Sequence, residues 1–282
     1  MSTKDFKFLV FGYGYLSKAI VQIAKKNNYD LTIVSRKKIK DNIFKSICYN
    51  RLNDIKNDLK HYFAISTVPP NENGEDYVLN SVDKNIISTF SKIIYISSTS
   101  VYPSGLVNED SITSNLSERG KIRNKIENEW KSITNTIIVR PGGIYCNENN
   151  VMTKFLRGNH EIIFKKDHYT NRIHIEDLVG IIFKTLLFKN PPKVINAVDE
   201  DFVITYDVVK EICKKFNLPN PKKINYKNKI ISQNSRSFFQ VSKQVKSKYV
   251  TKKMNYQFKH KNFSKSLTEI TKIFLQKRTQ KI

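Results

Sequence analysis

The sequence has no long apolar run, few acidic residues and few cysteines. No stretch approaches the roughly 20 apolar residues of a membrane-spanning helix, and the opening MSTKDFKFLV lacks the charged, apolar and small-residue order of a secretion signal. The three cysteines, Cys48, Cys146 and Cys213, show neither metal-ligand spacing nor a disulfide framework. We therefore expect a cytoplasmic protein with free thiols, no membrane partner and no metal.

The shortage of acids gives the chain a large positive charge. There are 25 acidic residues against 49 basic ones, which gives a formal net charge of +24, and residues 222–282 contain a single acid, Glu269. A basic surface attracts polyanions, but nucleic-acid readers favour arginine forks and exposed aromatics, and only nine of the basic residues are arginines. We interpret the excess as a solvated lysine coat, which argues against a nucleic-acid partner and suits a small anionic substrate.

Strand-like apolar runs alternate with helical patterns through the first two thirds of the chain. The runs that predict strands are FKFLVF (6–11), LTIVS (31–35), FKSICY (44–49), YFAIST (62–67), KIIYISS (92–98), TIIVR (136–140) and KVINAV (193–198). Helices are predicted over about 15–26, near 76–91, over 117–132 and over 176–188. The polar stretches 142–172 and 218–240 contain turn-like dipeptides and read as irregular.

This alternation predicts an α/β protein whose parallel sheet has helices on both faces. We expect a Rossmann-type doubly wound sheet over residues 1–145, completed by about 176–198. Residues 146–175 and 199–282 are expected to form a small C-terminal substrate lobe. The oligomeric state is left open, and a homodimer is compatible with this organisation.

The stretch FLVFGYGYLSKAI (8–20) has the form of a dinucleotide-binding turn between a strand and a helix. The first glycine of such a motif makes the tight turn, the second lets the backbone approach the pyrophosphate, and the third packs helix against strand. Gly12 and Gly14 satisfy the first two roles, and Ser17 replaces the third. We expect Gly12, Gly14 and the following Tyr15 and Leu16 to bind a nicotinamide dinucleotide; the alternative is an ordinary strand-to-helix turn.

The residues after the second strand predict which dinucleotide is bound. NAD-selective sites place an acid there for the ribose 2′-hydroxyl, whereas the 2′-phosphate of NADP needs hydroxyl and cationic donors. The strand ends in Ser35 and Arg36, followed by two lysines, and Asp30 is expected to lie before the strand, on the wrong side for the ribose. We therefore expect NADP, with NAD as the less favoured cofactor.

The stretch ISTVPP (65–70) ends the fourth strand, where ligands of doubly wound sheets bind. Its hydroxyl and backbone groups are predicted to contact the pyrophosphate or the nicotinamide ribose. The residues concerned are Ser66, Thr67 and Pro69.

Four stretches later in the chain together resemble the extended and atypical short-chain dehydrogenases, the NAD-dependent epimerase/dehydratase family. They are YISSTSVYP (95–103), RPGGIY (140–145), NRIHIEDLVGII (171–182) and SRSFFQVSKQVKSKYVTKKMNY (235–256). The resemblance spans nearly the whole chain in the family's order. It implies hydride transfer on a sugar nucleotide or related anionic carbonyl compound, with Ser98 hydrogen-bonding the reacting oxygen and Thr99 as its alternative.

The family's Tyr-x-x-x-Lys pair has no tyrosine here. In the stretch SERGKIRNKIENEW (117–130), one register puts Lys121 at the tyrosine position and Lys125 at the lysine position, and a second puts Arg119 and Arg123 there. A protonated lysine or arginine cannot serve as the same general acid and base without a large pKa shift. Lys121, the hydroxyl of Tyr102, or a water held by Ser98 and Thr99 could take that role.

Two functions remain open beside an enzyme of this type. One is a non-catalytic NADP-binding protein, a redox sensor or scaffold, and the other is a nucleic-acid-associated protein. His174 and Asp177 in the stretch RIHIEDL are interpreted as a packed histidine and a helix cap rather than as catalytic groups.

Overall fold

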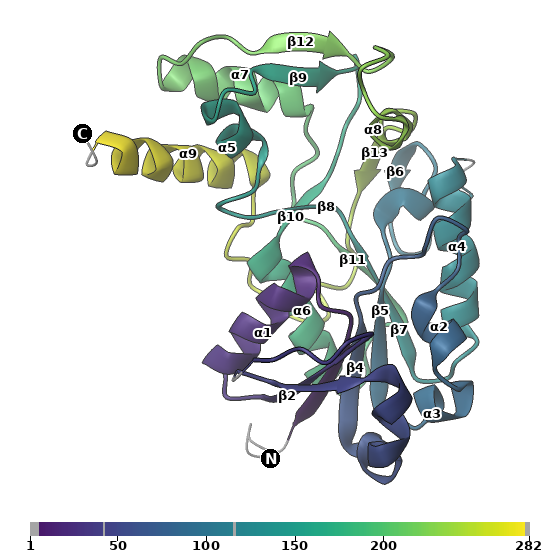
Figure 1. Cartoon of the computed structure of the whole chain (residues 1–282). Helices are drawn as coiled ribbons and strands as arrows, with labels where there is room; N and C mark the ends of the chain where they lie inside the picture. The colour runs from purple at the N-terminus through teal and green to yellow at the C-terminus, as the bar shows by residue number, and fades with distance from the viewer. Residues whose placement is uncertain (1–5, 42, 115–116, 280–282) are drawn as a thin grey trace.

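The computed structural model describes residues 6–41, 43–114 and 117–279, and its centre is a seven-stranded parallel sheet (Figure 1). Across the sheet the strands are β3 (Lys45–Cys48), β2 (Asp30–Ser35), β1 (Lys7–Phe11), β4 (Tyr62–Ser66), β5 (Lys92–Ile96), β7 (Thr136–Pro141) and β11 (Val194–Ala197). The direction in which the chain adds strands reverses between β1 and β4. In a doubly wound sheet a ligand binds at this switch point, beyond the carboxyl ends of the strands.

Strand β1 is apolar throughout because both faces of the sheet are covered. Phe8 and Val10 pack into one buried cluster, and Leu9 and Phe11 pack into the other. Successive side chains of a strand point to opposite faces, so a strand buried on both sides reads as a continuous apolar run. This is why the run at 6–11 predicts a central strand.

Helices cover the two faces of the sheet (Figure 1). The first cluster is completed by α1 (Tyr15–Lys26) and α6 (Ile175–Leu187), and the second by α2 (Tyr77–Ser81), α3 (Lys84–Ser88) and α4 (Glu118–Lys131). The predicted α/β fold with a doubly wound parallel sheet is therefore confirmed.

A third buried cluster lies apart from the sheet (Figure 1). It is formed around α5 (Val151–Leu156), α7 (Thr205–Lys215), α9 (Phe263–Thr279) and the strand pair β9 (Glu161–Phe164) and β12 (Lys222–Asn225). We refer to these elements as the small lobe. They fall within the ranges expected for a substrate lobe, and the domain boundaries themselves remain a proposal.

Two further strand pairs join distant parts of the chain. Strand β8 (Gly143–Tyr145) pairs with β10 (Arg172–His174), and β6 (Gly105–Val107) pairs with β13 (Lys243–Val245). The short helix α8 (Gln233–Phe238) precedes β13. Among the described residues, no helix combines the length and apolar character needed to cross a bilayer.

Some local predictions were wrong. The helix expected near 76–91 is two short helices, because Asp76 caps the start of α2 and Asp83 caps the start of α3. A 3-10 helix at Tyr49–His61 was not predicted. The stretches expected to be irregular contain β8, α5, β9, β12 and α8. Asp30 is the first residue of β2 rather than preceding it, although it still lies at the end opposite Ser35.

Candidate functional site

The glycine turn after β1 has the geometry of a phosphate-binding loop. Gly12 has a φ of +91°, and a Cβ there would lie 2.9 Å from Val68 Cγ2 and 3.2 Å from Thr67 Oγ1. Gly14 differs, since a Cβ built on it would meet nothing within 4 Å. Gly12 is therefore required by the fold, whereas Gly14 leaves open space at the start of α1, where backbone N–H groups and the helix dipole favour an anion.

Ser17 explains how the turn is held without a third glycine. It is fully buried, and its Oγ lies 2.7 Å from Thr67 Oγ1, which in turn donates to the Phe11 carbonyl oxygen at 2.9 Å. The Gly14 backbone N–H donates to Ser17 Oγ at 3.4 Å. These three hydrogen bonds, which we call the Ser17 relay, join the start of α1 to the ends of β1 and β4.

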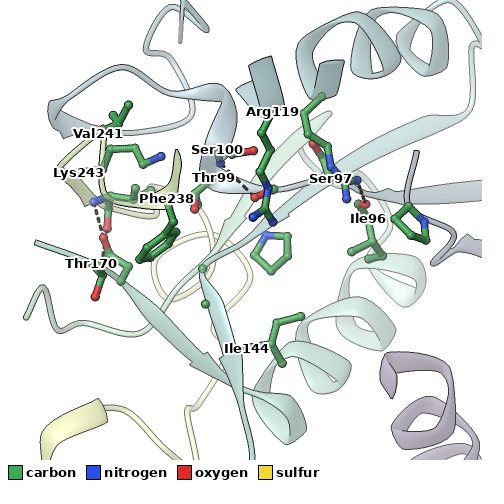
Figure 2. A pocket seen from close by; sticks show the side chains of 18 of the residues that line it. Ile96, Ser97, Thr99, Ser100, Arg119, Ile144, Thr170, Phe238, Val241 and Lys243 are labelled. Atoms are coloured by element: carbon green, nitrogen blue, oxygen red, sulfur yellow. Dashed lines mark hydrogen bonds between the residues drawn. The ribbon is translucent and has the colours of Figure 1, made fainter. Parts of the chain in front are cut away.

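A cavity of about 510 Å³ runs from this turn along the carboxyl ends of β4, β5 and β7 (Figure 2). Of the residues predicted to bind cofactor, it is lined by Gly14, Tyr15, Leu16, Thr67 and Pro69. The predicted catalytic residues Ser98 and Thr99 line it too. The structure thus brings together seven predicted site residues from three separate stretches of sequence.

Ser98 lies at the end of β5 and begins the 3-10 helix Thr99–Val101. Its Oγ accepts a hydrogen bond from the Ser100 backbone N–H at 3.1 Å. This bond uses the oxygen as an acceptor, so the Ser98 O–H remains able to donate to a ligand in the cavity. The neighbouring Ser97 turns inward instead and donates to Glu127 Oε1 at 2.6 Å.

Helix α4 presents Arg119 and Arg123 to the cavity, and Lys121 and Lys125 to solvent. Lys121 pairs with Glu118 at 3.1 Å, and Lys125 lies 4.0 Å from Glu129. The predicted register with Lys121 and Lys125 as catalytic residues is therefore not the one that faces the cavity. Residues two apart on a helix are about 200° apart around its axis, so only one of the two pairs can point inward.

The two arginines of α4 differ in their surroundings. Arg123 Nη1 donates to the Tyr95 hydroxyl at 3.0 Å and to the Ile96 carbonyl oxygen at 3.4 Å. Arg119 has no hydrogen bond or ion pair with any side chain in the described part of the chain. Arg123 is thus fixed to the end of β5, while Arg119 is available to a ligand.

A buried polar network lies beneath the cavity, and the sequence did not predict it. Arg140 binds Glu127 through Nε at 2.9 Å and Nη2 at 2.6 Å, and its Nη1 donates to the Tyr102 hydroxyl at 2.7 Å. Burial alone would raise the pKa of the Glu127 carboxyl, but the Arg140 guanidinium outweighs it and the pKa is lowered. The pair therefore stays charged in the core.

This network removes Tyr102 from the candidates for acid and base. Its hydroxyl donates to Asn196 Oδ1 at 2.9 Å, the side chain is fully buried, and burial raises its pKa. Tyr102 does not line the described cavity. With Lys121 on the solvent side of α4, a water held by Ser98 and Thr99 is the remaining candidate of the three.

The predicted coenzyme-selecting residues lie outside the cavity lining. Ser35 Oγ donates to the Lys37 carbonyl oxygen at 2.5 Å, and Arg36 is exposed. The positive charge of Arg36 acts against the burial that raises the pKa of Tyr49. Ser66 is buried, and its Oγ has no hydrogen-bond partner among the described residues. NADP selection at Ser35 and Arg36 remains a prediction.

The far end of the cavity contains residues to which the sequence gave no role. They come from the segment before β10 and from the α8–β13 region, and they are His168, Tyr169, Thr170, Asn171, Ser237, Phe238, Val241, Lys243 and Val245. The family resemblance includes parts of these segments, and it was the one signal in the sequence that could have pointed to them as cavity residues. Both burial and the Arg119 charge lower the pKa of Lys243, to about 8.

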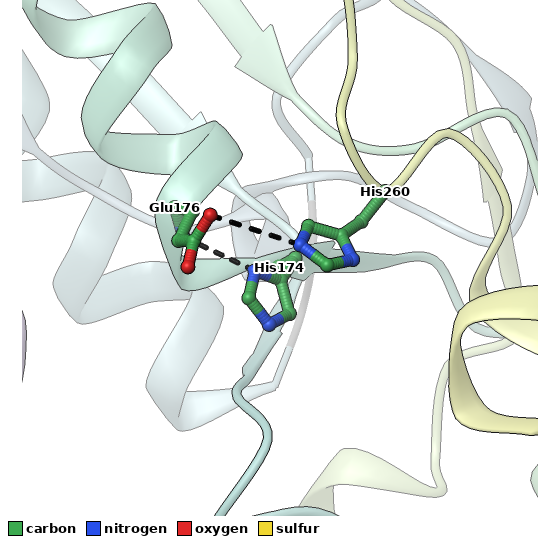
Figure 3. Close-up of side chains that lie close together, drawn as sticks. All are labelled: His174, Glu176 and His260. Carbon is green, nitrogen blue, oxygen red and sulfur yellow. Dashed lines mark hydrogen bonds and ion pairs between the residues drawn. The ribbon is translucent and has the colours of Figure 1, made fainter. Parts of the chain in front are cut away.

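His174, Glu176 and His260 form a separate cluster at the start of α6 (Figure 3). Their ligand atoms lie within 4.8 Å of one another. However, His174 Nδ1 accepts from the Glu176 backbone N–H at 3.3 Å, and its Nε2 lies 3.2 Å from Asn147 Oδ1. The two imidazoles stack with centroids 3.6 Å apart, so their in-plane lone pairs do not converge on one point. The arrangement suits a packed histidine rather than a metal centre.

Asp177 ties the chain after β13 to the start of α6. Its Oδ1 accepts from the Tyr256 hydroxyl at 3.0 Å and from the Lys259 N–H at 2.9 Å, and its Oδ2 accepts from the His260 N–H at 2.8 Å. His174, not Asp177, caps α6. These contacts agree with a packed histidine at His174, whereas the prediction that Asp177 caps the helix was wrong.

The chain was compared with known protein families, curated proteins and solved structures. No family model and no curated protein matches the sequence. Solved structures do match: a conserved protein of unknown function from Silicibacter pomeroyi (TM-score 0.79, 21% identity, 95% of this chain and 98% of that chain) and human epimerase family protein SDR39U1 with NADPH (0.73, 16%, 95% and 99%). MoeE5 in complex with UDP-glucose and NAD matches with a TM-score of 0.71, 15% identity and coverage of 95% and 99%. The chain therefore has the fold of the NAD-dependent epimerase/dehydratase structures, as the resemblance implied.

Proposed function

We propose that this chain is an NAD(P)-dependent oxidoreductase or epimerase of the short-chain dehydrogenase type that acts on an anionic carbonyl substrate such as a sugar nucleotide. One observation carries the proposal: a single cavity joins the open glycine turn at Gly14 to the Ser98 hydroxyl at the end of β5. A dinucleotide pyrophosphate at the start of α1 would extend toward Ser98 along this cavity.

The residues present fit a dinucleotide. A Cβ at Gly12 would collide with the β4 loop, the space beside Gly14 is open, and the Ser17 relay holds the turn in place. When bound, the cofactor supplies a hydride acceptor or donor. NADPH is bound in the SDR39U1 structure and NAD in the MoeE5 structure; we favour NADP for this chain because no acid follows β2 beside Ser35 and Arg36.

The protein groups would then position the substrate oxygen. The Ser98 O–H is free to donate to it, and Arg123, held by Tyr95 and Ile96, brings a fixed positive charge beside the same strand end. The proton would pass to a water held by Ser98 and Thr99, since the described cavity lining offers no tyrosine from α4. General acid–base help of this kind contributes about 100-fold to 10,000-fold in rate.

The cofactor proposal is tested by fluorescence titration of NADPH against Gly14→Val. The valine side chain would occupy the open space at the start of α1, so we expect binding to be abolished while the protein still folds. Ser91→Val is the matched control, because Ser91 is exposed and precedes the opposite end of β5. Unchanged NADPH affinity in Gly14→Val would remove the proposal.

Arg119 favours a second candidate function, a non-catalytic NADP-binding protein, because a protonated arginine cannot serve as the general acid and base that the family's tyrosine provides. Arg119 faces the cavity from α4, the helix that carries the tyrosine in the family. The assay is oxidation of NADPH with a panel of keto-sugars by the parent and by Ser98→Ala. We expect turnover by the parent and a loss of about 100-fold in the variant, with NADPH binding preserved. Absence of turnover with intact NADPH binding would support the non-catalytic role.

A further inference from the structure

Arg119 and Lys243 reach the same cavity from distant elements. Arg119 lies in the first turn of α4, and Lys243 is the first residue of β13, which pairs with β6. Figure 2 shows the two side chains on different sides of the cavity, with Thr99 and Ser100 between them in that view. Both residues line the same described cavity, and burial, then the Arg119 charge, lowers the pKa of Lys243.

Nothing in the described protein compensates these two charges. No aspartate or glutamate is among the described residues that line the cavity. In that same part of the chain, neither the Arg119 guanidinium nor the Lys243 ammonium forms an ion pair or a side-chain hydrogen bond. Lys243 is half-buried and Arg119 is exposed at the cavity, and like charges that face one cavity repel each other unless an opposite charge joins them.

The cofactor pyrophosphate does not reach this pair. It would bind at the start of α1, beyond β1 and β4, whereas Arg119 belongs to α4, which packs against β7 and the 3-10 helix that follows β5, and Lys243 belongs to β13, which pairs with β6. Strand β5 lies two strands from β1 in the sheet order, which is about 10 Å at the usual strand spacing. The Arg119–Lys243 pair therefore faces the part of the cavity that the substrate would occupy.

We infer that Arg119 and Lys243 form a subsite for an oxyanion group of the substrate, a carboxylate or a phosphate, beside the reacting centre at Ser98. The inference rests on the proposed function, because it treats this end of the cavity as the substrate end. The inference predicts that the substrate carries a carboxylate or phosphate, and that this group binds at the end of the cavity distant from the cofactor pyrophosphate. The guanidinium offers a two-pronged donor and the ammonium a point charge, a combination that suits either group.

The test uses inorganic phosphate and pyruvate as probes. Each is titrated calorimetrically into the full-length protein at constant ionic strength, with and without saturating NADPH. We expect saturable binding of at least one probe at millimolar concentration, also with NADPH present, and a loss of about tenfold in affinity in Arg119→Gln and in Lys243→Gln, the effect of one charge-assisted hydrogen bond. The preferred probe identifies the phosphate or the carboxylate.

Lys121→Gln and Lys246→Gln are the matched controls, because both lysines are exposed, one on α4 and the other just after β13. Both controls should bind the probes as the parent does. The subsite is refuted if neither probe binds saturably, or if Arg119→Gln and Lys243→Gln bind them like the parent.

The failure of this inference can be separated from the failure of the proposed function. Loss of NADPH binding in Gly14→Val, with no effect of Arg119→Gln or Lys243→Gln on the probes, removes the subsite and keeps the cofactor site. A protein that binds the probes through Arg119 and Lys243 but never binds NADPH keeps the subsite and removes the proposed function.

Discussion

Ser17 Oγ lies 2.7 Å from Thr67 Oγ1 and donates its proton to it, because the Thr67 hydroxyl is itself a donor to the Phe11 carbonyl oxygen. The serine therefore replaces a glycine at a packing position and adds a hydrogen bond between helix and strand that a glycine cannot form. The glycine turn after β1 is held by polar contacts in place of close packing alone.

Removing either hydroxyl of this pair should destabilise the protein. We expect Ser17→Ala and Thr67→Val each to lower the free energy of unfolding by about 1 kcal/mol, the usual net value of a buried hydrogen bond. Urea unfolding measures the change. Because both variants break the same bond, the double variant should lose less than the sum of the two, by at least about 0.5 kcal/mol. Strictly additive losses would mean that the two hydroxyls are not coupled.

Arg36 should select the coenzyme. Charge-assisted contacts to the 2′-phosphate contribute roughly 1.5 to 3 kcal/mol each, so Arg36→Ala should weaken NADPH binding about tenfold or more and leave NADH binding nearly unchanged. Fluorescence titration with both coenzymes measures this, and Lys37→Ala, at the neighbouring exposed residue, is the control. Equal losses for the two coenzymes would assign Arg36 another role.

The buried pair of Arg140 and Glu127 should be costly to break from one side. Arg140→Met leaves the Glu127 carboxylate buried without its bidentate partner, and we expect a loss of about 3 to 5 kcal/mol in the free energy of unfolding. Lys131→Met removes a half-exposed partner of the same carboxylate and should cost less than about 1 kcal/mol. Equal effects of the two substitutions would contradict the buried charge pair.

His174 should make the protein less stable in mild acid. Burial, then the positive charge of His260, lowers the pKa of His174 to about 4 in the folded chain, against about 6.5 when unfolded. The unfolded state takes up the proton first, so this contribution is fully present above pH 6.5 and is lost as the pH falls toward 4. Measured by urea unfolding, the difference in stability between the parent and His174→Gln should change by up to about 3 kcal/mol over this window, with the parent losing more stability than the variant as the pH falls. An unchanged slope in the variant would place the acid sensitivity elsewhere.

Asp199 should act in the opposite direction. Burial, then the negative charge of Asp201, raises the pKa of Asp199 to about 8, and its carboxylate oxygens have no hydrogen-bond partner in the described structure. The folded state holds the proton longer than the unfolded state, so stability from this group is present below about pH 4 and is lost as the pH rises to 8. Asp199→Asn should therefore be more stable than the parent at pH 8 and gain little at pH 4, measured by urea unfolding. A variant that is less stable at both values would contradict the assignment.

The sequence predicted the elements whose burial leaves a clear pattern. Helix α1 begins and ends at the expected residues, because its apolar positions repeat at helical spacing and the glycine turn marks its start. The ends of the sheet strands were predicted to within one to two residues, because strands buried on both faces appear as continuous apolar runs. Strands β9 and β12 were missed, since their pairing depends on contacts between segments far apart in the chain.

The sequence predicted the site residues that follow the ends of strands. It did not predict which residues of α4 face the cavity, because that depends on how the helix is rotated about its axis. Gly14, Thr67 and Ser98 follow strands of one sheet, so they meet at one edge by topology. In α4, basic residues at every second position make two four-residue spacings equally good in the sequence. Only the rotation of the helix, set by Ile126 and Trp130 packing on the sheet, turns Arg119 and not Lys121 toward the cavity.

The pairing of β13 with β6 has a consequence for synthesis on the ribosome. Chains emerge and fold from the N-terminus, so β1, β2 and β4 can pair, and the Ser17 relay can form, while most of the small lobe is still untranslated. The cavity wall that carries Lys243 is added only when β13 reaches β6. A nascent chain can therefore acquire its glycine turn early, whereas a ligand that spans the whole cavity can stabilise the protein only after β13 has been synthesised.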